Sequence, residues 1–529
     1  MRPDPAPQLA AVLFDMDGVV TDTAGAHVAA WQRLFDEYLQ QRAQQRDDEW
    51  QPFDPDRDYR RYVDGKPRYD GVQSFLKARG IELPYGEESD APERETICGL
   101  GNRKDQYFRA WLADNRVEVY PGTRRLIAEL RRRGVKVAVF SASRNATAVL
   151  ANAGAERLFE TKVDGSDLAA LGLPGKPEPA MLLEAATRLG VAPERTAVLE
   201  DAIAGVEAGV RGGFGLVIGV DRGDYGAELR KAGAQLVVHD LGELALSRDN
   251  VLLVKTLANL PGLAAEEERI RRRLSGKTPA VFLDYDGTLT PIVEDHTKAL
   301  LAGDMRAAVA ELARHCKVAI VSGRDLAMLQ KLVSIDSVYY AGSHGFEIAG
   351  PKGWSKSLEK GAEFLPELDR AEKRLEAELA DIKGHAVERK RFSIAVHYRR
   401  VAEADLPRIE QVVEQVLTDH RGLKQGYGKK VFEIQPAISW HKGRAVLWLL
   451  EQLDLDRPGI LPLYVGDDIT DEHAFRALSG RGLGIAVRDH ESRPTAADYA
   501  LAGPGEVKGF LELLAGLARG PVGRPPGRD

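Results

Sequence analysis

An apolar run that ends in Asp-x-Asp-Gly-x-x-Thr occurs twice in this chain of 529 residues. The first copy follows AAVLF and reads DMDGVVTDT from Asp15, and the second follows AVFL and reads DYDGTLTPI from Asp284. Acidic residues contribute little to a hydrophobic core, but at the carboxyl end of a buried strand their oxygens are well placed to bind a ligand. The repeat therefore predicts two α/β units, each with a site of its own.

Further short apolar runs end at polar residues or glycine in both halves, which is typical of buried parallel strands. VKVAVF precedes Ser141, TAVL precedes Glu200, KVAIV precedes Ser322 and LPLYV precedes Gly466. Helix-like segments lie between these runs, such as PGTRRLIAELRRRG, which has an apolar face and a terminal glycine. The alternation predicts a doubly wound, Rossmann-like parallel sheet in each half.

Composition restricts the class of protein. A chain of this length with 44% apolar and 29% charged residues is expected to form at least two soluble globular domains. The net charge of −7 gives no general basic surface, so nucleic acid is not an expected partner. Cys98 and Cys316 fit neither a disulfide framework nor a metal-ligand spacing. With no signal peptide or membrane span in the pattern, we expect a cytoplasmic location and no membrane partner.

Domain boundaries follow from where these patterns stop. We expect a first domain over residues 1–240 and a second over 277–516. The segment 241–276 contains the charged stretch AEEERIRRR and is predicted to be a helical linker. Residues 517–529 are rich in proline, glycine and arginine and are expected to be disordered.

Both halves contain the residue types that hydrolysis of a phosphate monoester requires. This reaction is among the slowest known in water, and its catalysis needs a nucleophile, a proton donor, donors to the phosphate oxygens and a metal. In the first half the candidates are Asp15 as nucleophile, Asp17 as acid/base, Ser141, Lys176, and Glu200 with Asp201 as metal ligands. In the second half they are Asp284, Asp286, Ser322, Lys442, and Asp467 with Asp468.

Each of these signals has an ordinary structural explanation when it stands alone, such as a turn, a surface loop or a helix cap. Their order and spacing favour a functional one, because Lys176 precedes Asp201 by 25 residues and Lys442 precedes Asp467 by 25. A calcium loop is disfavoured for DYDGTLTPIVE, since its glycine is fourth and not sixth. Both halves resemble the haloacid dehalogenase phosphatase superfamily, whose four motifs appear in order in each.

The candidate metal sites offer oxygen ligands only, which favours Mg²⁺ over zinc or copper. The resemblance implies a Mg²⁺ site in the second half made by a side-chain oxygen of Asp284, the carbonyl of Asp286 and the carboxylate of Asp467, next to Asp468. The corresponding residues of the first half are Asp15, Asp17, Glu200 and Asp201.

The two halves differ in where their long insertion lies. Asp15 and Ser141 are 126 residues apart, whereas the matching interval of the second half is 38. Ser322 and Lys442 are 120 residues apart, whereas the matching interval of the first half is 35. We expect a helical cap at about 25–118 and an α+β cap at about 350–436. Insertions at strand ends lie over the site, so the halves should share chemistry and differ in substrate.

The first half resembles β-phosphoglucomutases in TDTAGAHVAAW, SASRN and LEDAIAGVEAG. The resemblance implies that the substrate is bound by His27, Arg68, Lys104, Arg144 and Asn145. Arg68 and Lys104 would hold a second phosphate or the sugar. The implied reaction is conversion of β-glucose 1-phosphate to glucose 6-phosphate, and a plain sugar-phosphate phosphatase remains an alternative, because the distinction depends on cap closure.

The second half resembles trehalose-6-phosphate phosphatases in DYDGTLTPI, VSGR, AGSHGFEI, SIAVHYR, GKKVFEI and GDDITDE. The resemblance implies substrate contacts from Gly323, Arg324, Ser343, His344, Gly345, Glu347, Lys390, His397, Arg399, Lys430 and Glu433. The sequence departs from the family at Gln435, Arg389 and His441, and we expect His441 to be structural or solvent-facing.

Together the resemblances imply hydrolysis of trehalose 6-phosphate through an aspartyl-phosphate on Asp284, fused to a phosphosugar mutase or phosphatase that uses Asp15. Small phosphosugars are the expected partners, and the oligomeric state is left open. One alternative is a phosphatase for another sugar, such as sucrose phosphate or mannosylglycerate phosphate. Another treats the first half as a non-catalytic scaffold or regulatory module.

Overall fold

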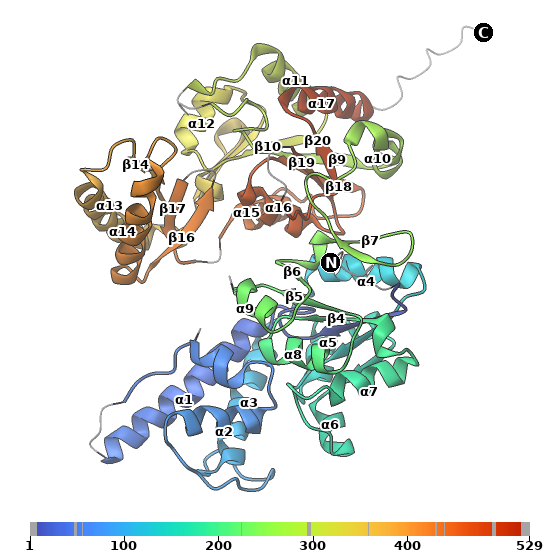
Figure 1. Ribbon diagram of the computed structural model, residues 1–529. Helices are drawn as coiled ribbons and strands as arrows, with labels where there is room; N and C mark the ends of the chain where they lie inside the picture. Colours follow the sequence, from blue (N-terminus) through green and yellow to red (C-terminus); the bar gives the residue numbers. More distant parts are fainter. Residues whose placement is uncertain are drawn as a thin grey trace. The chain divides into compact units, whose positions relative to one another are not determined.

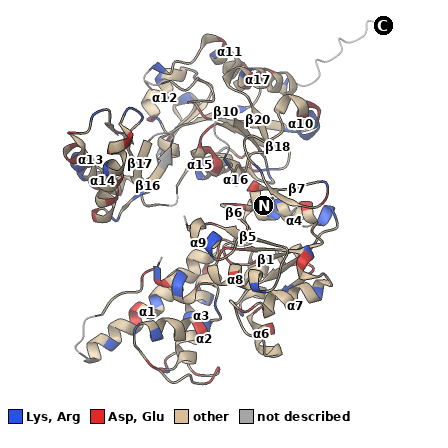
Figure 2. Ribbon diagram, viewed as in Figure 1, with Lys and Arg blue, Asp and Glu red and all other residues tan. Residues whose placement is uncertain are grey.

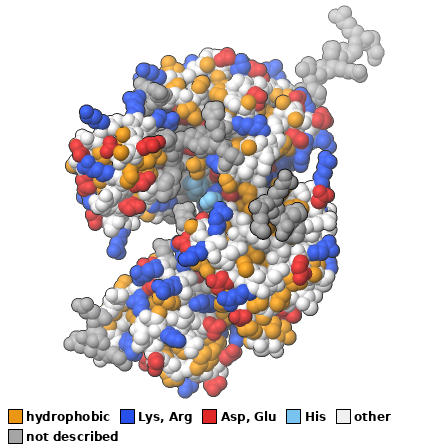
Figure 3. Space-filling view, in the orientation of Figure 1, with side chains coloured by type: hydrophobic (Ala, Val, Ile, Leu, Met, Phe, Trp, Pro, Cys, Tyr) orange, Lys and Arg blue, Asp and Glu red, His pale blue; other side chains and the backbone are white. Residues whose placement is uncertain are grey.

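The computed structural model describes residues 8–46, 50–55, 57–223, 225–293, 298–357, 359–428, 431–438, 440–488 and 493–519. The chain divides into two compact units, Met1–Lys255 and Thr256–Asp529 (Figure 1). Lys and Arg are interspersed with Asp and Glu over the helices of both units (Figure 2). On the face drawn in Figure 3, hydrophobic side chains lie scattered among polar and charged ones. Within the described residues, no helix is both long and apolar enough to cross a membrane.

The first unit has a six-stranded sheet of order β3-β2-β1-β4-β5-β6, in which all neighbouring strands are parallel. The strands are β1 (Ala11–Asp15), β2 (Lys136–Phe140), β3 (Thr161–Val163), β4 (Thr196–Glu200), β5 (Leu216–Val220) and β6 (Leu236–Val238). The helices are α4 (Pro121–Arg132), α5 (Ala146–Asn152), α6 (Gly165–Leu171), α7 (Ala180–Leu189), α8 (Ile203–Arg211) and α9 (Gly226–Lys231).

Both faces of this sheet are buried. Val12 and Phe14 of β1 pack in one hydrophobic cluster, and Ala11 and Leu13 pack in another. Alternate residues of a strand point to opposite faces, so the run AVLF is apolar throughout because helices cover both sides. The predicted doubly wound fold is confirmed.

A helical cap is inserted after β1. It consists of α1 (Ala24–Arg46), a π-helical turn (Tyr59–Val63), α2 (Arg68–Ala78) and α3 (Ile97–Asp114) (Figure 1). The cap has its own hydrophobic cluster, which includes Trp31, Phe35, Phe75 and Leu100. The cap therefore has an aromatic cluster of its own, while Ala30 of α1 and Phe108 of α3 pack in a core cluster of the sheet.

The segment 241–276 differs from the predicted helical linker. It contains an antiparallel hairpin of β7 (Leu244–Leu246) and β8 (Leu252–Val254), and only α10 (Glu267–Leu274) is an α-helix. Leu244, Leu246 and Leu252 are buried in a core cluster of the first unit, since the alternation in LALSRDNVLLV is that of strands. Residues from Thr256 onward belong to the second unit.

The second unit has an eight-stranded sheet of order β13-β12-β11-β10-β9-β18-β19-β20. β12 and β13 pair antiparallel with their neighbours, and the other neighbouring strands are parallel. The strands are β9 (Thr278–Leu283), β10 (Lys317–Val321), β11 (Tyr339–Gly342), β12 (Glu347–Ala349), β13 (Ser355–Ser357), β18 (Ile460–Gly466), β19 (Leu483–Val487) and β20 (Tyr499–Leu501). The helices are α11 (Gly303–Ala313), α12 (Leu326–Val333), α15 (Lys442–Gln452), α16 (Glu472–Leu478) and α17 (Pro504–Ala518).

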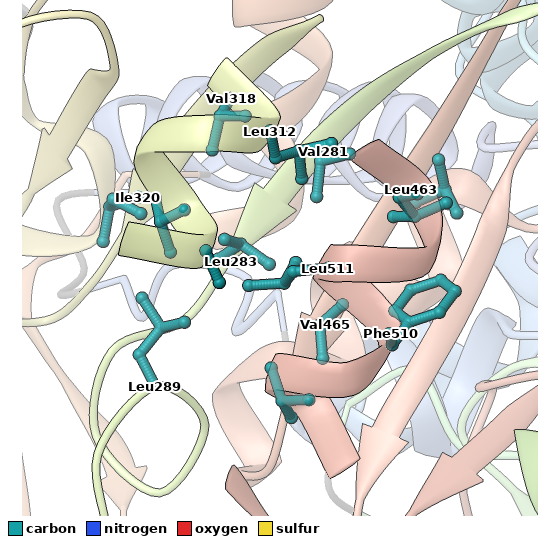
Figure 4. Close-up of a cluster of buried hydrophobic side chains, with 14 of the residues drawn as sticks. Val281, Leu283, Leu289, Leu312, Val318, Ile320, Leu463, Val465, Phe510 and Leu511 are labelled. Atoms are coloured by element: carbon teal, nitrogen blue, oxygen red, sulfur yellow. The ribbon is translucent and has the colours of Figure 1, made fainter. Parts of the chain in front are cut away.

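The core of the second unit has the same two-sided arrangement. Val281 and Leu283 of β9 pack with Val465 and with Leu511 of α17 (Figure 4), whereas Phe282 packs in the cluster on the other face. Helix α17 ends at Ala518 and therefore includes the first two residues of the predicted tail 517–529. Residues 520–529 lie outside the described residues.

The second cap combines helices with a four-stranded antiparallel sheet of order β14-β15-β17-β16. Its elements are α13 (Leu365–Leu379), β14 (Ala386–Arg389), β15 (Ile394–His397), α14 (Leu406–Asp419), β16 (Leu423–Gly428) and β17 (Val431–Pro436). Residues 355–357, which we predicted to belong to the cap, form β13 at the edge of the core sheet. The α+β character agrees with the prediction.

Candidate active sites

The two copies of the repeat lie at equivalent positions. Asp15 is the last residue of β1, and Asp284 follows β9 directly, so each is at the carboxyl end of a central strand. The repeat's glycine is needed for a close approach. A Cβ atom on Gly18 would lie 1.8 Å from Asp201 Oδ2, and one on Gly287 would lie 2.2 Å from Asp467 Oδ2. The glycine of each turn therefore leaves room for an acidic residue that follows another strand, Asp201 in the first unit and Asp467 in the second.

A buried lysine joins two carboxylates in each unit. Lys176 Nζ lies 2.5 Å from Asp15 Oδ1 and 2.8 Å from Glu200 Oε2. Lys442 Nζ lies 2.9 Å from Asp284 Oδ1 and 2.7 Å from Asp471 Oδ1. Burial alone would lower the pKa of both lysines, but the paired carboxylates outweigh burial and raise it. Both lysines are therefore protonated cations at neutral pH.

The carboxylate beside the lysine comes from different chain positions in the two units. Glu200 directly precedes Asp201, whereas Asp471 follows Asp467 by four residues. In each unit a glycine stands where the other unit has this carboxylate: Gly466 corresponds to Glu200, and Gly205 corresponds to Asp471. A Cβ on Gly205 would lie 2.0 Å from Glu200 Oε2, and one on Gly466 would lie 2.4 Å from Asp471 Cγ. A side chain at the glycine would collide with the carboxylate that is present, so each unit has room for a carboxylate from only one of the two positions.

Asp468 lines the cavity of the second unit, but it is not among the three carboxylates that converge in this unit. Its side chain accepts a hydrogen bond from Ile469 N at 2.7 Å and begins the 3₁₀ turn Ile469–Asp471, and its backbone N–H donates to Asp471 Oδ2 at 2.8 Å. Asp471 lies beside Lys442 instead and accepts a hydrogen bond from Tyr464 at 2.6 Å. The metal role of Asp468 stays a prediction, and the sequence did not indicate Asp471, because adjacency in sequence does not determine which way a side chain points after a strand ends.

Three carboxylates converge in each unit closely enough to bind one cation. Among the described residues these groups are Asp15, Glu200 and Asp201 in the first unit, and Asp284, Asp467 and Asp471 in the second, with ligand atoms within 4.8 Å of one another. Burial, followed by the neighbouring carboxylates, raises the pKa of Asp201 well above its usual value. A buried, oxygen-only set with excess negative charge suits a hard divalent cation such as Mg²⁺.

Asp17 and Asp286, the second aspartates of the repeats, have different surroundings. Asp17 lies 3.3 Å from His27 Nε2, and it accepts hydrogen bonds from Thr23 and from Ser141, the latter at 3.3 Å. Burial alone would raise the pKa of Asp17, but His27 and Thr23 outweigh it and lower the pKa to about 2. Asp286 receives two hydrogen bonds from Arg324, at 2.6 and 2.7 Å.

The first cavity has a volume of about 360 Å³ and lies between the core and the helical cap. Its lining includes all five residues that the β-phosphoglucomutase resemblance predicts: His27, Arg68, Lys104, Arg144 and Asn145. It also includes residues that the sequence reasoning missed, namely Tyr59, Asp64, Glu88 and Asp105. Nothing in the local pattern of these acids distinguishes them from surface charges, so only the fold could identify them.

The second cavity has a volume of about 240 Å³ and reaches from Asp284 to the strands of the second cap. Predicted residues in its lining are Gly323, Arg324, His344, Lys390, His397, Arg399 and Glu433, and Glu388 was missed. Glu433 connects these walls, because it lies 2.8 Å from His344 Nε2 and 3.2 Å from Lys390 Nζ. Ser322, the predicted phosphate donor, also lines this cavity.

Three residues predicted to contact substrate are not among the described lining of this cavity. Ser343 donates a hydrogen bond to Asp325 Oδ1 at 3.3 Å, and Glu347 pairs with Arg391. A Cβ on Gly345 would lie 2.3 Å from Ala445 Cβ, so this glycine allows close packing against α15. These residues hold the loop that carries His344. Lys430 lies outside the described residues.

His441 has a structural position, as expected. It is the N-cap of α15, where its Nδ1 accepts a hydrogen bond from Arg444 N at 3.3 Å, and its ring stacks on His473 at 4.3 Å. Burial, followed by neighbouring positive groups, lowers the pKa of His441 to about 2 and that of His473 to about 4. Both rings are therefore neutral at pH 7.

The stacked pair predicts a loss of stability in mild acid. Between about pH 6.5 and 4 His473 is protonated in the unfolded state but not in the folded state, so the free energy of unfolding falls as the pH falls. Between pH 7.5 and 5, the melting temperature of the wild type should drop by at least about 2 °C more than that of His473→Phe, which keeps the stack. Equal drops measured by circular dichroism would contradict this role.

Each unit has carboxylates at the ends of central strands around a buried lysine, which is an arrangement typical of haloacid dehalogenase-like hydrolases. Residues 9–213 match haloacid dehalogenase-like hydrolases, and residues 282–505 match the trehalose-phosphatase family. A trehalose-phosphate phosphatase of Mycobacterium leprae is 38% identical over 406 residues, which cover 74% of this chain and 91% of that protein. The chain belongs to the trehalose-phosphate phosphatase family.

Two other similarities extend the comparison. An uncharacterized glycosyl hydrolase of Mycobacterium tuberculosis is 39% identical over 514 residues, or 96% of this chain, and the chain spans only 38% of its length. A crystal structure of β-phosphoglucomutase from Clostridium difficile is 26% identical, covers 44% of this chain and 92% of that protein, and has a TM-score of 0.35.

Proposed function

We propose that the second unit hydrolyses trehalose 6-phosphate to trehalose and phosphate through Asp284. We propose further that the first unit is a phosphosugar mutase or phosphatase that uses Asp15. The observation that carries the first proposal is that Asp284 and the Glu433 network of the cap line one and the same cavity. A phosphate can lie at Asp284 while the cap contacts sugar hydroxyls.

The geometry supports nucleophilic catalysis by Asp284. Its carboxylate attacks phosphorus, the bond between phosphorus and the sugar oxygen breaks, and the departing oxygen takes a proton from Asp286. Water then attacks the aspartyl-phosphate and returns a proton to Asp286. Lys442 orients Asp284 through Oδ1 and neutralises its charge. Asp286 must exchange part of its double contact with Arg324 for the substrate.

Mg²⁺ bound by Asp284, Asp467 and Asp471 would offset the negative charge of the phosphate. The protein buries these carboxylates, and hydrogen bonds fix the orientation of two of them. Thr288 donates to Asp467 Oδ1 at 3.3 Å, and Tyr464 holds Asp471. Mutation of residues that hydrogen-bond to metal ligands typically lowers metal affinity or activity by about 10- to 100-fold.

A comparison of substrates tests the proposed specificity. Phosphate release should be measured for trehalose 6-phosphate, sucrose 6-phosphate, mannosylglycerate phosphate and p-nitrophenyl phosphate. We expect kcat/KM for trehalose 6-phosphate to exceed the others by at least ~10²-fold, because buried polar groups reject substrates that leave them unpaired. Equal values across the sugars would contradict the proposal.

Glu433 provides a sharper test of sugar recognition. Burial alone would raise the pKa of Glu433, but His344 and Lys390 outweigh it and hold the pKa well below its usual value. Glu433→Gln removes the charge that organises both partners. We expect KM for trehalose 6-phosphate to rise roughly 10- to 100-fold, since hydrogen bonds to charged groups contribute about 1.5–3 kcal/mol. The rate with p-nitrophenyl phosphate should hardly change.

Glu347→Gln is the matched control for that variant. Glu347 pairs with Arg391 and is not among the described residues lining the cavity, so its KM should stay close to the wild-type value. If Glu347→Gln raised KM as much as Glu433→Gln, the assignment of the sugar site to the Glu433 network would be wrong.

Removal of divalent metal should abolish the activity of both units. Dialysis against EDTA is expected to lower each rate at least ~10²-fold, and Mg²⁺ should restore it. Binding to the folded state also stabilises it by about 2.7 kcal/mol at 100 times the dissociation constant, so Mg²⁺ should raise the melting temperature. Full activity in the chelator, or an unchanged melting temperature, would contradict a Mg²⁺ site.

The first unit has the complete set of core groups, which supports a catalytic role over a scaffold. Lys176 bridges Asp15 and Glu200 as Lys442 bridges Asp284 and Asp471. A buried carboxylate cluster costs stability, and a purely structural unit would gain by losing it. The cap residues of this unit differ from those of the second, so we infer a different phosphosugar substrate.

A further inference from the structure

A short loop of the second core connects the Glu433 network of the cap with Ser322, the predicted hydrogen-bond donor to phosphate. His344 lies at the centre of this loop, between β11 and β12. Its ring Nε2 lies 2.8 Å from Glu433 Oε2 on β17, and its backbone N–H donates to the carbonyl of Ser322 at 2.9 Å. One residue therefore contacts both the cap strand that carries Glu433 and the core segment that carries Ser322.

The backbone of this loop has an unusual conformation. Ser343 and His344 have φ angles of 48° and 56°, in the left-handed region that residues with a side chain rarely adopt. Two such residues in succession cost free energy, so the surrounding structure must hold them. Ser343 is buried, and its backbone N–H donates to the carbonyl of Arg324 at 2.8 Å. The conformation of the loop thus depends on the segment 322–324.

The ring of His344 packs on Gly323. A Cβ atom on Gly323 would lie 2.8 Å from Cε1 and 2.9 Å from Nε2 of this ring. The next residue, Arg324, donates its backbone N–H to Ser322 Oγ at 3.2 Å. Because Ser322 Oγ is the acceptor in that bond, its hydroxyl hydrogen can point to a phosphate oxygen in the cavity. The ring thus lies directly on the backbone that orients this hydroxyl group.

A second contact of the cap reaches the same part of the core. The backbone N–H of Arg391, between β14 and β15, donates to Asp325 Oδ1 at 3.2 Å, and Ser343 Oγ donates to the same oxygen at 3.3 Å. Asp325 directly follows Arg324. Both contacts join the cap to the segment 322–325 or to the loop packed on it. The position of the cap and the geometry of this segment are therefore linked.

Glu433 can bind a sugar hydroxyl without releasing His344. Its Oε2 contacts His344, and its Oε1 accepts hydrogen bonds from Ser393 at 3.0 Å and from Lys390 at 3.2 Å. A carboxylate has about four lone-pair sites, so one remains after these three contacts. A bound sugar would therefore add to the network and not replace it.

We propose that His344 is a positioning residue that couples sugar binding at the cap to phosphate binding at Ser322. A sugar bound to the Glu433 network holds this strand against His344, and the ring holds Gly323 and the Ser322 hydroxyl in the orientation that binds phosphate. Sugar and phosphate then bind cooperatively even when no covalent bond joins them, and the binding energy of the remote sugar assists the reaction. This inference rests on the proposed assignment of the sugar site to the Glu433 network.

Trehalose provides the test, because it contains the sugar without the phosphate. In the full chain with Asp15→Asn, which keeps the first unit silent, hydrolysis of acetyl phosphate should be measured with Mg²⁺ at zero and at saturating trehalose. We expect trehalose to raise kcat/KM at least ~10-fold, as is typical of coupling between two sites. In titration calorimetry, inorganic phosphate should likewise lower the Kd of trehalose, because coupling of two binding events is reciprocal.

Three variants test whether this effect passes through His344. His344→Asn tolerates the left-handed backbone but removes the ring, and Gly323→Ala keeps the ring but places a Cβ against it. In both, activation by saturating trehalose should fall below about twofold. His344→Gln keeps a donor for Glu433 and should retain an intermediate activation. The readout is the ratio of the rates with and without trehalose, so a change in the basal rate does not affect the comparison.

His385→Ala and Gly303→Ala are the matched controls. His385 Nδ1 lies 2.6 Å from the carbonyl oxygen of Ile382 within the cap. A Cβ on Gly303, at the start of α11, would meet no atom of the described residues within 4 Å. Neither residue is among the described lining of the cavity, so both variants should keep the wild-type activation.

The results separate this coupling from its alternatives. If trehalose does not activate the wild type, or if His344→Asn and Gly323→Ala keep full activation, the inference is wrong. A loss of trehalose binding in both variants with an unchanged kcat/KM for acetyl phosphate would make His344 a sugar contact only, and would also overturn it. If the wild type does not hydrolyse trehalose 6-phosphate, the proposed function itself fails, whatever the result with acetyl phosphate.

Discussion

Asp284→Asn is expected to lower kcat for phosphate release from trehalose 6-phosphate by at least ~10³-fold. Asparagine keeps the shape of the side chain, but its amide cannot act as the nucleophile that forms the acyl phosphate. The variant should fold, since Lys442 keeps its partner Asp471 and the amide oxygen still accepts a hydrogen bond. Steady-state release of inorganic phosphate measures the effect, and trapping of a phosphorylated chain should fail.

Asp15→Asn is the matched variant in the first unit. Because that unit has its own sheet, cap and core clusters, we expect trehalose 6-phosphate hydrolysis to stay within about twofold of the wild-type rate. The reverse pattern, in which Asp15→Asn abolishes this activity and Asp284→Asn preserves it, would assign the reaction to the first unit and contradict the proposal.

The second large effect concerns the carboxylate beside Lys442. Asp471→Gly removes one partner of this buried lysine and the acceptor of Tyr464, so we expect a loss of activity of at least ~10²-fold and of roughly 3–5 kcal/mol in stability. Gly466→Glu should also be damaging, because a Cβ at this position would lie 2.4 Å from Asp471 Cγ.

The double variant Gly466→Glu/Asp471→Gly should recover function. It reproduces in the second unit the arrangement of the first, where Glu200 supplies the carboxylate and Gly205 leaves room for it. We expect activity at least ~10-fold above either single variant and a coupling free energy of at least ~1.4 kcal/mol in urea unfolding. Additive losses would show that the two positions do not share one space.

Asp468→Asn is the control for this series. Asp468 caps the 3₁₀ turn through Ile469 N, and Asn is also a good cap, so the variant should retain most of the activity. The comparison tests whether Asp468, the metal ligand expected from the sequence, or Asp471, the residue in the carboxylate cluster, matters more for activity. A larger loss for Asp468→Asn than for Asp471→Gly would return the role to Asp468.

Much of the fold follows from local patterns, and the failures have identifiable causes. The runs around Asp15 and Asp284 are fully buried strands because apolar residues fill both faces, and that signal is strong in sequence. The hairpin at 244–254 has strands of only three residues each, too short for a strong periodic signal in the sequence. Its three buried leucines show the alternation of strands only once the turn at 247–251 is recognised.

Some residues of the two candidate sites were predictable from the sequence, and others were not. The sequence by itself predicted two clusters of strand-end carboxylates with a lysine, since Asp15, Lys176, Asp284 and Lys442 lie in ordered motifs whose spacing reflects the strand and helix that carry them. Residues at strand ends are predictable because the carboxyl edge of a parallel sheet brings them together whatever the loops do.

Only the tertiary structure decided which further acids join each centre. Asp471 joins Asp284 and Asp467, Glu388 lines the second cavity, and Asp64 of the cap lines the first. The direction of a side chain leaving a turn, and the docking of a cap on its core, depend on contacts between residues far apart in the chain. Local spacing does not encode those contacts, so the residues at the strand ends were predictable and the acids that join them from other segments were not.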